Sequence, residues 1–376
     1  MQSPRHPDVG VDDVEVDYIE VDKHELLDLL DFCLDAADLA SLQTRVSAFR
    51  STVAGTPVIS LPAVPHPGAS GNGADALMLR RDILLEELDQ IATARTLRRA
   101  RYYLERLHKS ATETRVSAVN DINLNRWKEY DEILTDSLWT VEKRDSTGAH
   151  GAWYWGNFIP QIPRQLMLRY TKAGDWVLDP FLGSGTTLIE CRRLGRHGIG
   201  VELNADVARR ASEVIKQEPN PHGVTTAVTQ GDSATIDFEA LLDDHGVPEV
   251  QLVLLHPPYH DIIRFGDSAA DLSNATTVDD FVEQFGAIAA RAMDVLAGGR
   301  YLAVVIGDKY EDGEWIPLGF RTMQAVLNQG CTLKSIVVKN LNGTRAKRDQ
   351  QALWRYRALV AGFYVFKHEY IFIFQK

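Results

Sequence analysis

The stretch from Gly174 to Glu202, GDWVLDPFLGSGTTLIECRRLGRHGIGVE, constrains the fold of this chain more than any other. It begins with a short apolar strand at Trp176 to Leu178, passes through a glycine-bearing turn and predicts a helix from Thr186 to Arg193. A second apolar strand, Gly198 to Val201, ends on the acid Glu202. Glycines let a ligand approach the backbone, and the first amides of a helix can meet an anion. Because an acid about 20 residues beyond the glycines can bind ribose hydroxyls, the stretch predicts a site for a ribose-bearing cofactor.

The residues of the turn discriminate between cofactor classes. A nicotinamide or flavin site requires G-x-G-x-x-G and a P-loop requires a lysine, and the turn has neither. It instead resembles the S-adenosylmethionine motif of the DNA amino-methyltransferases, which methylate adenine N6 or cytosine N4. This resemblance implies a doubly wound α/β fold and S-adenosylmethionine as cofactor. It is carried by Asp179, Pro180, Phe181, Leu182, Gly183, Ser184, Gly185, Thr186 and Thr187.

Further positions match cofactor-binding segments of the same family. Glu202 would bind the ribose, and Asp232, which follows another predicted strand, would accept a hydrogen bond from the adenine amino group of the cofactor. In the segment GNFIPQIP, the resemblance assigns the methionine end of the cofactor to Asn157, Phe158 and Pro160. Without the resemblance, this aromatic segment could be a lid over the core, and an Asp after Gly could be part of a turn.

The predicted strand Val250 to Leu255 runs into His256-Pro257-Pro258-Tyr259, which resembles the (D/N/S)PPY motif of these enzymes. An exocyclic amino nitrogen is a poor nucleophile because its lone pair is delocalised into the base, so the site must supply acceptors for its N–H bonds. The motif assigns this task to the side chain at position 256 and to the Pro257 carbonyl. Pro258 fixes the turn, and Tyr259 offers a face to the flipped-out base.

Histidine at position 256 departs from the family, which usually carries Asp or Asn for adenine and Ser for cytosine. The target base is therefore left open. Neutral histidine can accept a hydrogen bond and protonated histidine cannot, so we expect activity to fall as the pH drops through a pKa near 6.5. A catalytically inactive relative is the alternative explanation of this substitution.

The charge distribution points to nucleic acid despite a formal net charge of −12. Residues 1–40 carry twelve acids and two basic residues, whereas residues 95–109 and 339–357 each carry six Lys or Arg and one acid. The first basic run is either a solvated helix face or a DNA-backbone contact. The second lies among the last predicted strands, and the predicted DNA contacts within it are Arg345, Lys347 and Arg348.

Composition also predicts the domain organisation. Residues 1–22 are acidic and thinly apolar and are predicted to be disordered. Residues 23–135 are predicted to be a helical region with a Pro/Gly/Ser-rich linker near 55–75, and no internal repeat suggests a solenoid. Residues 136–376, which the resemblance covers, are predicted to form a seven-stranded, doubly wound α/β methyltransferase domain, with a mobile loop after the PPY motif.

The chain has no apolar run near the ~18 residues of a membrane span and no signal-peptide pattern, so a cytoplasmic, nucleoid-associated protein is expected. No metal is expected to be needed, because the sulfonium of the cofactor is already activated. The isolated cysteines are predicted to be reduced thiols in the core. They are Cys33, Cys191 and Cys331.

The resemblance therefore implies methyl transfer from S-adenosylmethionine to an exocyclic amino group of DNA, in restriction-modification or phage defence. RNA guanine and protein glutamine amides are alternative substrates of PPY-type sites. A third hypothesis is a DNA-binding subunit of a modification complex with a vestigial methyl site. A restriction or defence partner subunit would suit either DNA role, and the sequence leaves the oligomeric state open.

Overall fold

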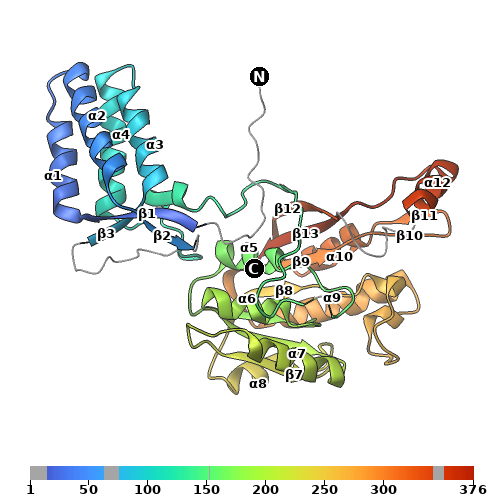
Figure 1. Ribbon diagram of the computed structural model, residues 1–376. Helices are drawn as coiled ribbons and strands as arrows, with labels where there is room; N and C mark the ends of the chain where they lie inside the picture. Colours follow the sequence, from blue (N-terminus) through green and yellow to red (C-terminus); the bar gives the residue numbers. More distant parts are fainter. Residues whose placement is uncertain (1–14, 63–75, 152, 342–350) are drawn as a thin grey trace. The chain divides into compact units, whose positions relative to one another are not determined.

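The computed structural model describes residues 15–62, 76–151, 153–341 and 351–376 (Figure 1). These residues form two compact units, one ending at Ile133 and the other beginning at Leu134. Each unit has its own apolar core. Among the described residues, no helix is both long enough and apolar enough to cross a membrane.

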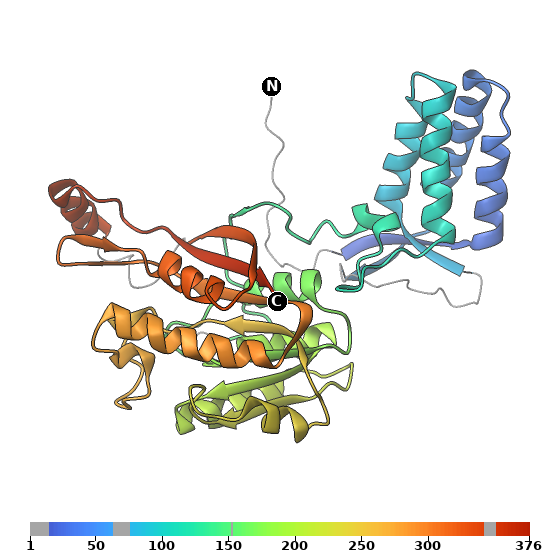
Figure 2. The ribbon, with the colours of Figure 1, turned by 180° about the vertical axis from the view of Figure 1, so that it is seen from behind.

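The described part of the N-terminal unit contains four helices, three strands and one 3₁₀ turn (Figure 2). The strands form an antiparallel sheet in the order β2-β1-β3. The predicted disorder of residues 1–22 is wrong for Glu15–Asp22, which form β1, while residues 1–14 lie outside the described part. Residues 59–62 of the predicted linker also form a strand. The bounds are β1 Glu15–Asp22, α1 Lys23–Leu34, α2 Leu39–Gly55, β2 Ile59–Pro62, β3 Ala76–Arg80, α3 Arg81–Ala92, α4 Leu97–Thr112 and η1 Leu124–Glu129.

The N-terminal unit contains an internal repeat that the sequence did not reveal. Helices α1 and α3 begin 58 positions apart, and so do α2 and α4. The pairing of β1 with β3 centres on Glu20 opposite Met78, again 58 positions apart, so a pseudo-two-fold axis relates the two β-α-α halves. The halves share a burial pattern more than residue identity. Equivalent buried pairs are Leu26 and Leu84, Leu30 and Leu88, Cys33 and Ile91, Leu42 and Ala100, Val46 and Leu104, Phe49 and Leu107, and Val53 and Ala111.

The C-terminal unit is built on one mixed sheet in the order β4-β12-β13-β9-β8-β5-β6-β7. Strands β5 to β9 are parallel, and β13 runs antiparallel between β9 and β12. The predicted doubly wound α/β fold is confirmed, although the described sheet has eight strands because the two-residue β4 joins its edge. The bounds are β4 Leu138–Trp139, β5 Trp176–Asp179, β6 His197–Glu202, β7 Thr226–Gln230, β8 Val250–Leu255, β9 Leu296–Ile306, β10 Lys309–Glu311, β11 Glu314–Ile316, β12 Thr332–Asn340 and β13 His368–Gln375.

Helices cover both faces of this sheet. Helices α8, α9 and α10 share the main core with the strands, and α5 and α6 pack together on the opposite face, where α7 lies against the start of α6. The three cysteines are buried and free, as predicted for core thiols. The helix bounds are α5 Gln161–Tyr170, α6 Thr186–Leu194, α7 Ala205–Gln217, α8 Phe238–Asp243, η2 His260–Ile262, η3 Leu272–Asn274, α9 Val278–Asp294, α10 Leu318–Leu327 and α12 Gln351–Ala361.

The strand order reverses at β5, which pairs with β6 on one side and with β8 on the other. In open α/β sheets, ligands bind at the carboxyl ends of the strands at such a reversal. Asp179 ends β5, Glu202 ends β6 and His256 follows β8. The fold therefore brings the two halves of the predicted site to the same edge of the sheet.

Candidate active site

Asp179 organises the glycine turn from the inside. Its Oδ1 accepts the Phe181 N–H at 3.0 Å, and its Oδ2 accepts the Thr187 hydroxyl at 2.5 Å. The side chain is only 1% exposed, and this burial raises the pKa of Asp179 to about 6. Two residues that the sequence assigned to the cofactor, Asp179 and Thr187, are thus bonded to each other and hold the turn in shape.

The turn itself exposes backbone rather than side chains. Gly183 and Gly185 have φ of 53° and 87°, in the left-handed region that favours glycine. A Cβ on Gly183 would lie 3.0 Å from the ring of Tyr154, and α6 begins directly after Gly185. The Ser184 hydroxyl accepts a hydrogen bond from Asn157 Nδ2 at 3.2 Å. The glycines therefore form a narrow cradle at the start of a helix.

Glu202 connects the end of β6 to this cradle. Its Oε2 accepts the Gly183 N–H at 2.9 Å, and its Oε1 accepts the Asn204 N–H at 2.8 Å. The carboxyl is 8% exposed, and its burial raises its pKa. Each oxygen keeps one further lone pair, so the carboxylate can still accept two hydroxyl groups of a ribose.

The end of β7 is tied to the same turn. The Ser233 hydroxyl donates to the Pro180 carbonyl at 2.6 Å. Asp232 is partly exposed, its Oδ1 accepts the Ala234 N–H at 2.8 Å, and its Oδ2 has no partner among the described residues. Asp232 thus sits in a tight turn and retains an oxygen that could accept a hydrogen bond from a ligand.

The segment before α5 touches both halves of the site. Asn157 bonds Ser184 in the cradle, and the ring of Phe158 meets the His256 ring edge to face, with centroids 4.8 Å apart. Pro160 is buried and immediately precedes α5. Two consecutive residues therefore connect the glycine turn to the histidine that follows β8.

The motif after β8 presents two acceptors. The Pro257 carbonyl makes no hydrogen bond with any described residue, and Nδ1 of His256 has no partner among them either. Pro258 and Tyr259 are partly buried, and the Tyr259 ring packs on Gly307, where a Cβ would lie 2.9 Å away. An amino group placed between the carbonyl and the imidazole could donate both of its N–H bonds.

Histidine 256 does not titrate where the sequence predicted. Burial of the ring lowers the pKa of His256 to about 4, and the nearby Lys339 charge also lowers it, against an opposing effect of Glu369. The expectation of a pKa near 6.5 is therefore wrong. The sequence could not reveal the shift, because it comes mainly from burial of the ring, and residues distant in the sequence, such as Phe158 and Lys339, surround that ring.

Two functional candidates beside this motif were missed. The Tyr259 hydroxyl donates to Glu369 Oε2 at 2.9 Å, and Lys339 Nζ donates to Glu369 Oε1 at 2.8 Å. Lys339 on β12 lies directly opposite Glu369 on β13, and both are almost fully buried. Glu369 belongs to the ending HEYIFIFQK, and only the tertiary structure reveals its contact with Tyr259.

The loop predicted to be mobile carries two 3₁₀ turns and is anchored by specific contacts. Lys309 bonds His260 Nδ1 at 3.0 Å and pairs with Asp261, and His260 Nε2 bonds the Ala275 carbonyl at 2.9 Å. Further along the loop, the Phe265 ring stacks on Tyr154, with centroids 5.6 Å apart. Since Tyr154 also lies against Gly183, this aromatic pair connects the loop to the glycine cradle.

The remaining predicted contacts, Arg345, Lys347 and Arg348, lie outside the described residues. Lys339, counted with the same basic run, is in the interior and paired with Glu369.

Another group of buried ionisable side chains has a geometry that could hold a metal ion. It consists of Asp145, His150 and Glu190. The Arg193 guanidinium already pairs with Asp145 at 3.0 Å and with Glu190 at 3.4 Å, so a cation occupies this group.

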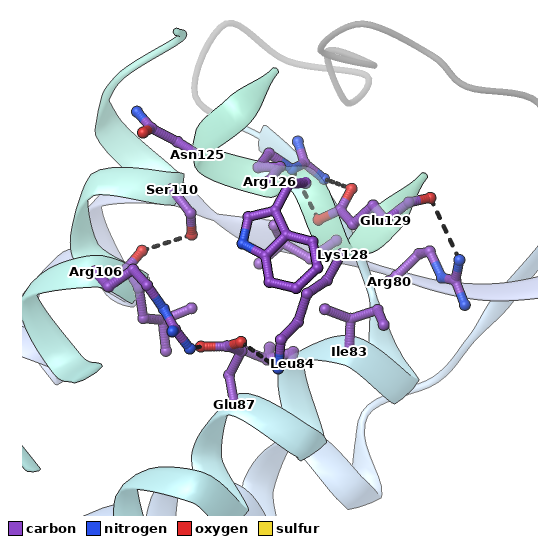
Figure 3. A pocket seen from close by; sticks show the side chains of 13 residues that line it. Arg80, Ile83, Leu84, Glu87, Arg106, Ser110, Asn125, Arg126, Lys128 and Glu129 are labelled. Carbon is purple, nitrogen blue, oxygen red and sulfur yellow. Dashed lines mark hydrogen bonds and ion pairs between the residues drawn. The ribbon is translucent and has the colours of Figure 1, made fainter. Parts of the chain in front are cut away.

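The N-terminal unit has a hollow of about 40 Å³ between α3, α4 and η1 (Figure 3). The cations that line it are paired with acids: Arg106 with Glu87, and Arg126 with Glu129 at 2.6 Å. Lys128 also pairs with Glu87, at 2.7 Å. The hollow is a neutralised polar cluster and offers no free charge to a ligand.

Comparison with known proteins supports the family resemblance. Residues 95–213 match a family model described as DNA methylase. The Type II methyltransferase M.MjaII of Methanocaldococcus jannaschii is 38% identical over 85 residues, which are 20% of this chain and 16% of that protein. M2.DpnII of Streptococcus pneumoniae is 41% identical over 95 residues, 25% of this chain and 34% of that protein. M.Cfr9I of Citrobacter freundii is 40% identical over 70 residues, 19% of this chain and 22% of that protein.

The matched segments span between 16% and 34% of these curated relatives. Among solved structures, TrmN from Thermus thermophilus gives a TM-score of 0.39 with 17% identity, over 59% of this chain and 50% of that one. The fold is established by this chain's own strand order and helices. The sequence matches confirm the predicted resemblance to the DNA amino-methyltransferases, and S-adenosylmethionine is the cofactor that this resemblance implies.

Proposed function

We propose that this chain is an S-adenosylmethionine-dependent DNA amino-methyltransferase that acts on adenine N6 or cytosine N4 of a flipped-out base. One observation carries the proposal. Two acceptors at the end of β8, the His256 ring and the unpartnered Pro257 carbonyl, adjoin the glycine cradle through Asn157 and Phe158. A cofactor site and an acceptor pair for an amino group are therefore neighbours.

The cradle fits the cofactor. Gly183 and Gly185 expose backbone at a helix start, Glu202 retains lone pairs for ribose hydroxyls, and Asp232 retains a free oxygen. Asn157, Phe158 and Pro160 are proposed to border the methionine end. S-adenosylmethionine supplies a methyl group on a positively charged sulfur, which needs no further activation.

The protein's contribution would be positioning and hydrogen-bond acceptance. With both N–H bonds held by His256 and the Pro257 carbonyl, the amino nitrogen is favoured in a tetrahedral geometry, and its lone pair is released from the base ring. Tyr259 would stack on the extruded base. His256 can serve as an acceptor at neutral pH because burial keeps the ring neutral there.

The proposed substrate requires a surface for the DNA backbone. Arg345, Lys347 and Arg348 remain proposed contacts. On the N-terminal unit, Arg95, Arg98 and Arg99 surround the start of α4 and are exposed. None of these three forms an ion pair with a described residue, in contrast to the cations of the hollow in Figure 3. Arg99 donates to the Tyr103 hydroxyl at 2.8 Å, but no acid neutralises its charge in the described structure. Arginines without an ion-pair partner at a helix N-terminus suit phosphate groups.

An alternative DNA surface in this unit, the β1–β3 ribbon, is less suitable. Two-stranded ribbons fit the major groove of DNA, whereas β1 is also paired with β2 in a three-stranded sheet. Here the helices cover one face, because Ile19 and Leu79 belong to the helical core. The other face carries the acid Glu20 opposite Met78, whose side chain is buried. Within this unit we therefore propose a phosphate contact at the α4 surface, defined as Arg95, Arg98, Arg99, Tyr102 and Lys109.

Nucleoside mass spectrometry of DNA from cells that express the chain tests the proposal. We expect N6-methyladenine or N4-methylcytosine with the wild type and with Glu213→Ala, an exposed control on α7. Glu202→Ala and His256→Ala should abolish the product. This experiment also identifies the target base.

The outcome separates the alternatives. Cofactor binding by the purified protein without any methylated DNA would refute DNA as substrate and favour RNA or a protein glutamine amide. Cofactor binding without methylation of any of these would favour a DNA-binding subunit with a vestigial site. A role in restriction-modification, with a nuclease partner and a location at the nucleoid, is part of the proposal and depends on the DNA result.

A further inference from the structure

The hydrogen bonds around His256 determine which of its two nitrogens carries the proton. Neutral histidine has two tautomers, and in each of them one nitrogen donates and the other accepts. Nε2 of His256 lies 3.4 Å from the Tyr259 hydroxyl oxygen, whereas Nδ1 has no partner among the described residues. The proton on the Tyr259 hydroxyl therefore decides whether Nε2 must donate or accept.

Glu369 fixes that proton. The Tyr259 hydroxyl has a single hydrogen, and Glu369 Oε2 accepts it at 2.9 Å. The other oxygen of Glu369 accepts from the Lys339 ammonium at 2.8 Å, so the carboxylate is ionised and can only accept. If Tyr259 turned its hydrogen to His256 instead, a buried carboxylate oxygen would lose its donor, which is costly.

We propose that Glu369 and Tyr259 are positioning residues that hold His256 in the Nε2–H tautomer and so leave Nδ1 as a bare acceptor. The Tyr259 oxygen, having donated its hydrogen to Glu369, accepts from Nε2–H. Lys339 maintains the charge of Glu369, and Gly307 leaves room for the Tyr259 ring. That Nδ1 serves the amino group of the substrate rests on the proposed function, whereas the tautomer does not.

The relay, by which we mean the hydrogen bonds from Lys339 through Glu369 and Tyr259 to His256, explains how histidine can replace the usual Asp, Asn or Ser of the motif. Those side chains offer an acceptor oxygen in any protonation state that occurs at neutral pH. Histidine has no oxygen, and its Nδ1 can accept a hydrogen bond only when the ring proton is on Nε2. Lys339 and Glu369 are a buried ion pair, 30 positions apart in the sequence. Glu369 orients the Tyr259 hydroxyl, whose oxygen then accepts the proton of His256 Nε2.

The test reads the tautomer directly. Protein labelled with ¹⁵N-histidine is examined by long-range ¹H–¹⁵N NMR, and the His256 signals are identified by their loss in His256→Asn. We expect a protonated Nε2 and a bare Nδ1 in the wild type at pH 7. In Tyr259→Phe, which keeps the ring and removes only the hydroxyl, we expect a mixture of tautomers. A protonated Nδ1 in the wild type would overturn the proposal, as would an unchanged tautomer in Tyr259→Phe.

Kinetics provide the second measurement. Tyr259→Phe should lower kcat for methylation by about two- to tenfold, the usual worth of one hydrogen bond, with the KM for S-adenosylmethionine unchanged. The control is Tyr310→Phe, whose hydroxyl donates to the Gly313 carbonyl at 3.1 Å, outside the relay. It should change neither the NMR signals of His256 nor kcat. If the tautomer is as expected but no DNA is methylated, the relay stands and the proposed function fails.

Discussion

The α4 surface gives the most quantitative prediction about DNA binding. We would replace Arg95 and Arg98 by glutamine together, because both are exposed and neither has an ion-pair partner in the described structure. The internal repeat provides a matched control. Positions 37 and 40, 58 residues earlier, are exposed alanines, and Ala37→Glu with Ala40→Glu changes the net charge by the same two units.

The expected magnitude follows from counterion release. Each lost phosphate contact reduces the slope of log Kobs against log salt concentration by about 0.9. Two lost contacts should therefore reduce the slope by about 1.8 and weaken binding roughly 60-fold at about 0.1 M salt. The assay is fluorescence anisotropy with a labelled duplex over a series of salt concentrations, with circular dichroism as a check on folding.

The control distinguishes a contact from a change in overall charge. If the arginine variant and the alanine variant weaken binding equally, the effect is a long-range property of net charge and the α4 surface is not a contact. An unchanged salt slope in the arginine variant would refute the reasoning outright. A reduced slope confined to the arginine variant would support it.

Three further predictions concern the C-terminal unit. Since the pKa of His256 is lowered to about 4, kcat should stay constant from pH 8 to about pH 5 as far as this residue is concerned and fall towards pH 4; a fall centred near pH 6.5 would contradict its burial. Asp179 has a raised pKa of about 6, so the folded protein binds this proton more tightly than the unfolded chain does, and stability should fall by about 3 kcal/mol as the pH rises from about 4 to above 6. Asp179→Asn should remove that fall, and thermal unfolding at several pH values measures it. If stability depends on pH identically in the wild type and in Asp179→Asn, the raised pKa of Asp179 is refuted. Arg193→Ala removes the cation paired with buried Asp145 and Glu218, and leaves Glu190 with Arg164 at 3.7 Å; it should cost about 3 kcal/mol in urea unfolding, whereas Arg209→Ala, in exposed pairs, should leave the midpoint unchanged.

The sequence predicted the C-terminal unit well because its signals are local. The strand Val250–Leu255 has the predicted bounds, and the helix predicted from Thr186 to Arg193 is α6, Thr186–Leu194. The sheet reverses its strand order at β5, and ligands bind at the carboxyl ends of strands at such a reversal. The sequence shows this arrangement directly, because the glycine turn, Glu202 and His256 each follow a predicted strand. Gly183 and Gly185 have positive φ angles that favour glycine, so this local geometry leaves a mark in the sequence that can be recognised without a structure.

The N-terminal unit was predicted less well, for a physical reason. The acidic strand Glu15–Asp22 has the composition of a disordered segment, and only its pairing with β2 and β3 makes it a strand. The repeat is hard to detect in the sequence because equivalent core positions share only a buried, apolar character. Leu42 is equivalent to Ala100, and Cys33 to Ile91.

By itself, the sequence determined the kind of fold, the cofactor motif and the acceptor motif, because each depends on residues that are neighbours along the chain. Tertiary structure decided the electrostatics of the site. Burial and the pairing of β12 with β13 bring Lys339 and Glu369 beside Tyr259 and His256, and a pKa depends on charges and desolvation in space rather than on sequence distance. The proposed acceptor, His256, could therefore be identified from the sequence, whereas its pKa depends on the fold.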